Sequence, residues 1–187
     1  MANQMLNLVL VPKYDNAAAD FGEGDGYMMG NYLVEYFTPS LRSTKFSSVD
    51  YTYEPDASAV TSDDLVCYVL PRQRASLILR KYPTLTLGQG GSTIWSPNDN
   101  AVISEVYLDS SQGDADRARL MANLIFHEWL HNRLDAGPHI YQDVHATPHG
   151  VLTTSGGINS NMRPAPADTV SMRRGLVHPH AQYTGGF

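Results

Sequence analysis

The stretch from Asp114 to Leu134 constrains the fold more than any other part of this 187-residue chain. It contains no glycine or proline, its apolar residues recur at helical spacing, and acidic residues stand near its start, where a helix N-terminus favours negative charge. The sequence therefore predicts one long helix here. Within it, His127 and His131 are four residues apart, so their side chains lie one turn apart on the same face.

Residues 127–131 read His-Glu-Trp-Leu-His and predict half of a metal site. Two imidazoles on one helix face can bind one zinc ion, and Glu128 beside them can reach a water molecule that the ion activates. Zinc lowers the pKa of the water molecule bound to it to about 7. Glu128 is the predicted general base that takes the proton from this water. In the alternative interpretation, the two histidines only pack or cap on an amphipathic helix, and the glutamate is solvated. Trp129 points away from this face and is predicted to pack in the core.

A third protein ligand must come from beyond the helix, because a hydrolytic zinc usually takes three and keeps one position for water. Asp135 continues the four-residue spacing. It lies roughly 12 Å along the axis from His127, however, since a helix rises about 1.5 Å per residue. The ligand is therefore expected on the chain that turns back after Gly137-Pro138.

His139 and His145 are equal candidates for this third ligand, because an extended return of about 3.3 Å per residue lets either one reach the helical histidines. His149 and Asp143 remain as further candidates, and Asp143 can instead orient one of the histidines as a hydrogen-bond acceptor. The group that would stabilise the negative charge of a transition state stays open among four residues. These are Tyr141, Tyr183, Arg163 and His149.

Composition argues against several other functions. The 42% of hydrophobic residues suffices for the core of one domain, while the net charge of −6 and the scattered 13 lysines and arginines argue against a nucleic-acid partner. The lone Cys67 lies in an apolar run and is predicted to be a small buried hydrophobe. The apolar run at residues 6–11 is too short for a secretory or membrane segment. We therefore expect a soluble, cytoplasmic protein with no membrane partner, with a longer parent protein or signal-independent export as the alternatives.

Apolar patterning and turn residues predict the remaining elements. Strands are expected at 6–12, at 46–53 and at 65–70, the last being central because it is continuously apolar. Helices are expected at 27–37, at 74–81 and at 168–174, where Gly175 ends the last one. An edge strand at 101–108 precedes the metal helix, and an exposed strand of this kind can pair with an extended substrate.

The motif at 127–131, the glycine turn after it, a later histidine and the segment Ser160-Asn161-Met162-Arg163-Pro164 together resemble the metzincin branch of zinc metallopeptidases. The resemblance covers about the last third of the chain. It implies zinc as the cofactor and a methionine turn beneath the metal, with Met162 in that turn; a plain core methionine is the alternative. The family pattern would need glycine at 134 and histidine at 137, where this chain has Leu134 and Gly137, so the third ligand is not carried over by position.

These observations predict an α+β fold of the zincin type, with a twisted mixed sheet and the 114–136 helix as the floor of a cleft. One domain, 1–187, would have an upper lobe at about 1–136 and a small irregular lobe from about 137. The predicted function is that of a zinc-dependent endopeptidase acting on protein or peptide substrates. Two alternatives are a zinc hydrolase of a non-peptide amide and a non-catalytic, zinc-stabilised binding or toxin-associated module. The module would be favoured by a closed site of four ligands, such as His127, His131, His139 and His145.

Overall fold

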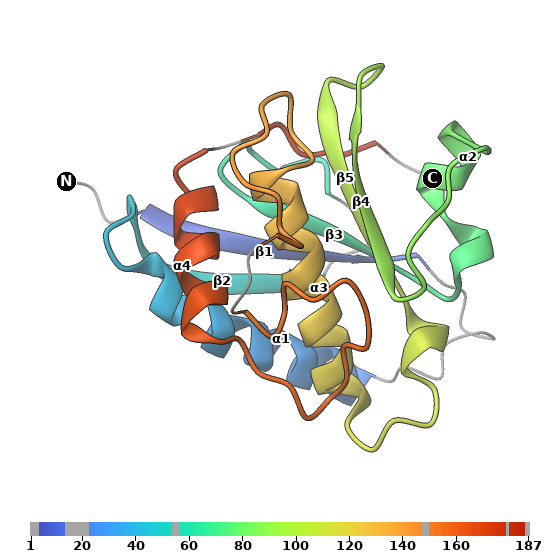
Figure 1. The fold of residues 1–187 in the computed structure, drawn as a ribbon, viewed down its shortest axis with the longest axis horizontal. Helices are drawn as coiled ribbons and strands as arrows, with labels where there is room; N and C mark the ends of the chain where they lie inside the picture. Colours follow the sequence, from blue (N-terminus) through green and yellow to red (C-terminus); the bar gives the residue numbers. More distant parts are fainter. Residues whose placement is uncertain (1–3, 14–22, 54–56, 147–149, 179, 186–187) are drawn as a thin grey trace.

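A five-stranded mixed sheet organises the chain in a computed structural model that describes residues 4–13, 23–53, 57–146, 150–178 and 180–185 (Figure 1). The strands are β1 (Gln4–Pro12), β2 (Phe46–Tyr53), β3 (Leu65–Leu70), β4 (Gly91–Ser96) and β5 (Ala101–Tyr107). Their order is β2-β1-β3-β5-β4, and only the β4–β5 pair is antiparallel. The predicted mixed sheet and the central position of β3 are confirmed.

The prediction for the edge of the sheet is wrong. Residues 101–107 form an inner strand between β3 and β4, and all seven of its residues are buried. The edge strand next to it is β4, which the sequence analysis did not identify as a strand. β4 contains serine, threonine and glycine and owes its extended shape to six residue pairs with β5, which no local pattern reveals.

Helices pack mainly on one face of this sheet. They are α1 (Glu23–Phe37), α2 (Leu77–Lys81), α3 (Arg117–Leu134) and α4 (Pro166–Gly175), with short 3-10 turns at Thr38–Leu41, Gln73–Ala75 and Leu108–Ser111. α3 packs against β5, β4, α1 and α4, and Figure 1 shows it lying across the sheet. The described residues from 137 to 165 form no helix or strand, as the glycine- and proline-rich composition predicted.

Successive side chains of β1 point alternately into two apolar cores, one on each face of the sheet. Leu6, Leu8 and Leu10 face a large cluster shared with α1, α3 and α4. Val9 and Val11 face a smaller cluster on the other side of the sheet, which includes residues of α2. Successive strand residues point to opposite faces, so one strand serves both clusters. Cys67 is fully buried in the larger cluster, as predicted.

The central helix α3 begins three residues later than predicted. Asp116 is its N-cap, and the Asp116 side chain accepts a hydrogen bond from the Arg119 backbone N–H at 3.1 Å. Asp114 lies before the helix and accepts a hydrogen bond from the Asp116 N–H. Trp129 is fully buried in the larger core and donates its indole N–H to the Val66 carbonyl at 3.0 Å. The prediction that Trp129 packs in the core is confirmed.

Trp129→Phe is expected to lower the free energy of unfolding by about 2 kcal/mol, because it removes a buried hydrogen bond and leaves a small cavity. Urea unfolding measures this change. Trp95→Phe on edge strand β4 is the matched control, and because Trp95 is only half-buried its effect should be below about 1 kcal/mol. Equal losses for the two variants would contradict the packing described here.

Among the described residues, no helix is long and apolar enough to cross a membrane.

Candidate metal centre

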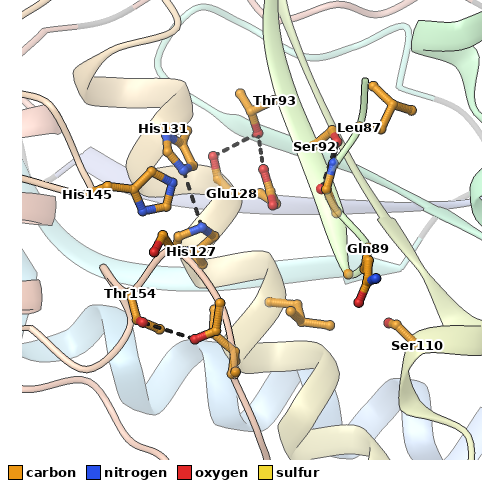
Figure 2. A pocket seen from close by; sticks show the side chains of 18 of the residues that line it. Leu87, Gln89, Ser92, Thr93, Ser110, His127, Glu128, His131, His145 and Thr154 are labelled. Carbon is orange, nitrogen blue, oxygen red and sulfur yellow. Dashed lines mark hydrogen bonds between the residues drawn. The ribbon is translucent and has the colours of Figure 1, made fainter. Parts of the chain in front are cut away.

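Three imidazoles converge at the middle of α3 (Figure 2). His127 and His131 come from successive turns of the helix, and His145 comes from the returning chain. One ligand nitrogen from each ring lies within 4.8 Å of the other two, and Nε2 of His131 is 3.2 Å from Nε2 of His127. These three histidines can hold a metal ion.

A hydrogen bond fixes the direction of each ring. Nδ1 of His127 is 2.5 Å from the Leu152 carbonyl oxygen, and Nδ1 of His145 is 3.1 Å from the Thr153 carbonyl oxygen. Nδ1 of His131 is 2.9 Å from a carboxylate oxygen of Asp135. Because carbonyl and carboxylate oxygens only accept, each Nδ1 must carry the proton.

The Nε2 atoms of the neutral rings are therefore acceptors that face one another. Two lone pairs 3.2 Å apart, on His127 and His131, repel unless a cation or a proton lies between them. Ligating histidines in proteins typically donate their second nitrogen to a carbonyl or carboxylate in this way. The arrangement fits a metal bound by three Nε2 atoms.

The pKa values of the helical histidines diverge in the metal-free chain. Burial, assisted by the charge of His131, lowers the pKa of His127 to about 4. Burial also opposes protonation of His131, but the hydrogen bond to Asp135 and the negative charge of Glu128 outweigh it and raise the pKa of that ring. Protonation is therefore opposed at His127 and favoured at His131. A bound metal ion would supply the positive charge instead.

Glu128 lies beside the histidines and is almost fully buried. One of its carboxylate oxygens accepts a hydrogen bond from the Thr93 hydroxyl of β4 at 2.8 Å (Figure 2). Burial raises the pKa of Glu128 to about 7, although the charge of His131 and the bond from Thr93 both lower it. A carboxyl with this pKa can accept and release a proton near neutral pH.

The three histidines and Glu128 face a cleft of about 590 Å³. Its walls are the segment 85–92, β4, one side of α3 and the segment 154–158. The apolar side chains in these walls are Leu85, Leu87, Ile94, Leu120, Leu124 and Ile158. Among the described residues that line it, no lysine, arginine or aspartate is present, so the histidines and Glu128 provide its ionisable groups.

Comparison of the chain with protein-family models, with curated proteins and with solved structures gave no match. The chemistry of the site must therefore be argued from its own residues.

The path of the chain after α3 explains why His145 joins the site and His139 does not. The backbone N–H of Tyr141 donates to the Leu134 carbonyl at 2.7 Å. This bond closes residues 135–140 into a loop beyond the end of the helix. His139 lies exposed in this loop, beside the ring of Tyr141. The second carboxylate oxygen of Asp135 accepts from the Val144 N–H at 3.0 Å and brings His145 back to the helix. Of the two candidate ligands, the structure brings only His145 to the two helical histidines.

The other candidate residues lie elsewhere. Asp143 accepts hydrogen bonds from the backbone N–H groups of His145 and Ala146, so it positions the chain at His145. Tyr183 packs in the smaller core on the other side of the sheet. Tyr141 stacks on the ring of His178, with centroids 3.7 Å apart.

Arg163 donates to the Ser160 and Met162 carbonyls near its own segment. Tyr141, Arg163 and Tyr183 are therefore not among the residues that line the cleft. His149 lies outside the described residues. The structure therefore brings none of these three described candidates to the cleft.

Met162 packs against the larger core, and its carbonyl accepts a hydrogen bond from the Asn123 side chain at 3.2 Å. Asn123 lies four residues before His127 on α3, so the 160–164 segment runs alongside the helix, one turn from the histidines. The assignment of Met162 to a methionine turn stays a prediction.

Sequence analysis missed the groups that orient the ligands. Asp135 was rejected as a ligand, but its spacing of four residues from His131 is a helical signal for the hydrogen bond observed. Thr93 and the carbonyls of Leu152 and Thr153 come from distant segments and carry no sequence signal.

Proposed function

We propose that this protein is a zinc-dependent peptidase with Glu128 as its general base. The observation that carries the proposal is the convergence of three Nε2 atoms beside a buried carboxylate at the floor of a cleft. Three imidazoles suit zinc, and a site with three protein ligands keeps a position open for water or substrate. Zinc bound here would polarise a substrate carbonyl and lower the pKa of water.

Glu128 would take the proton of the attacking water and pass it to the departing amine. In the metal-free chain, burial raises the pKa of Glu128 to about 7, which suits a group that takes and returns a proton near neutral pH. Thr93 fixes the carboxylate by hydrogen bonding. His127, His131 and His145 would hold the metal, each oriented through its Nδ1.

The strand that borders the cleft favours an extended peptide as the substrate. Edge strand β4 borders the cleft, and no strand of the described residues pairs with the outer side of β4. A substrate backbone paired with β4 would pass close to Glu128, since Gly91 and Thr93 of this strand both approach that carboxylate. The leucine and isoleucine side chains in the walls favour apolar substrate side chains.

Metal analysis combined with a digest tests the proposal. Untagged protein, purified without added metal, should contain about one zinc per chain by elemental mass spectrometry. It should cleave members of a proteome-derived peptide library, a chelator should stop cleavage, and zinc should restore it. Zinc without any hydrolysis would overturn the peptidase in favour of a binding module, and hydrolysis limited to non-peptide amides would favour the other hydrolase class.

Thr93→Val is expected to move the acid limb of the pH profile of kcat/KM to higher pH by about one unit. The Thr93 hydroxyl favours the ionised carboxylate, so its loss raises the pKa of Glu128 and the base is protonated at higher pH. A hydrogen bond to a charged group contributes about 1.5 kcal/mol, and a shift of one pKa unit corresponds to about 1.36 kcal/mol. The expected shift of the limb is therefore about one pH unit. Thr93→Ser keeps the hydroxyl and should keep the profile; an unshifted limb in the valine variant would contradict the assignment.

A further inference from the structure

Asp168, in the first turn of α4, extends a buried carboxylate toward the metal centre without touching it. The residue is fully buried, and its Oδ2 accepts a hydrogen bond from the Ala165 N–H at 2.6 Å, as expected of a helix cap. The same oxygen also accepts from the backbone N–H of Leu152 at 3.2 Å. This second bond joins α4 to the segment 150–153, and capping of α4 does not require it.

The segment 150–153 holds two of the three imidazoles. The Leu152 carbonyl accepts from Nδ1 of His127, and the next carbonyl, that of Thr153, accepts from Nδ1 of His145. The Leu152 side chain is fully buried in the larger core, and the Thr153 hydroxyl donates to the Gly150 carbonyl at 2.9 Å. Both orienting carbonyls therefore belong to one tightly held loop.

The loop is shaped around the Asp168 carboxylate. A Cβ at residue 150 would overlap this carboxylate, so glycine at 150 lets the backbone approach it closely. The N–H groups of Val151 and Thr153 face the carboxylate as well and favour its ionised form, although burial raises its pKa overall. A single side chain thus accepts a hydrogen bond from Leu152 and packs closely against Gly150 of the same loop.

We propose that Asp168 is a positioning residue of the metal centre: by holding the loop 150–153, it sets the direction in which Nε2 of His127 and Nε2 of His145 point. The inference rests on the proposed metal site, which it deepens. Leu152 supplies both the N–H that binds Asp168 and the carbonyl that binds His127, so a shift at one end of this residue moves the other. Nδ1 of His131 is held by Asp135 and not by this loop, so it serves as an internal reference for the effect of Asp168 on the other two histidines.

Asp168→Ala tests the proposal, because it removes the oxygen that accepts the hydrogen bond from the Leu152 N–H. Cobalt(II) alone is the probe, and its visible absorption reports the ligand geometry. We expect the affinity for cobalt to fall about 10- to 100-fold, with an altered absorption band, as for other residues that orient ligands. Met172→Ala is the matched control, since it removes a fully buried apolar side chain from the same helix and leaves the Asp168 carboxylate in place. It should lower the melting temperature and leave the cobalt spectrum unchanged.

Ring ¹⁵N signals of the metal-free protein test the positioning step without any metal. Asp168→Ala should change the Nδ1 and Nε2 signals of His127 and His145 and leave in place the Nδ1 signal of His131, which Asp135 holds. Unchanged signals of His127 and His145 in a folded variant would overturn the proposal, as would an unchanged cobalt affinity. Failure of the unaltered protein to bind cobalt would overturn the metal site instead, and the ring signals would then still decide whether Asp168 directs the two histidines.

Discussion

Glu128→Gln is expected to keep zinc bound and to lower kcat for peptide hydrolysis about a thousandfold, within the range that a general base contributes. Glutamine has nearly the same shape and can still accept the hydrogen bond from Thr93, but it cannot take a proton from water. The metal should stay because the three Nε2 atoms come from other residues. Steady-state kinetics on a cleaved peptide, with zinc content measured on the same sample, gives both quantities.

Glu105→Gln is the matched control for the loss of a buried carboxylate. Glu105 is fully buried on β5 and accepts hydrogen bonds from Ser76, Tyr107 and the N-terminus of α2. Because it does not line the cleft, its replacement should lower stability and reduce kcat far less than Glu128→Gln does; its charge acts on the reaction only by raising the pKa of Glu128. Undiminished hydrolysis by Glu128→Gln would remove Glu128 from the mechanism.

His145→Ala is expected to weaken zinc binding on the order of 100- to 1000-fold. The binding free energy of zinc at a site with four ligands is about 10–16 kcal/mol, so each ligand contributes roughly 3–4 kcal/mol. His139→Ala should bind zinc as the unaltered protein does, since His139 lies exposed outside the cluster. Competition with a chelating dye at fixed pH measures both affinities. A loss in His139→Ala without a loss in His145→Ala would reverse the assignment of the third ligand.

The centre of α3 could be predicted from the sequence because its determinants are local. Helical spacing placed His127, Glu128 and His131 on one helix, and it directed Trp129 to the core. The continuous apolar run of β3 correctly predicted a central strand. In each case, the residues that decide the outcome lie within one element.

The remainder of the site depends on contacts between distant segments. The choice between His139 and His145 is made by bonds from Tyr141 to Leu134 and from Val144 to Asp135, which the spacing of histidines does not reveal. Residues 101–108 were expected at the edge of the sheet, but β5 is an inner strand, and its Glu105 is satisfied inside the protein by groups from the 76–78 segment. Pairing partners, and not local pattern, decide both features.

The unequal exposure of the three histidines bears on the kinetics of metal exchange. His127 is buried at the helix centre, whereas His145 is exposed and is carried by the irregular chain beyond α3. A chelator can therefore approach from the His145 side, and release would begin with that ligand while the helix still holds two. The half-life of the bound ion should then depend on how often the irregular segment that carries His145 moves away from α3. A tightly bound metal can therefore exchange without global unfolding.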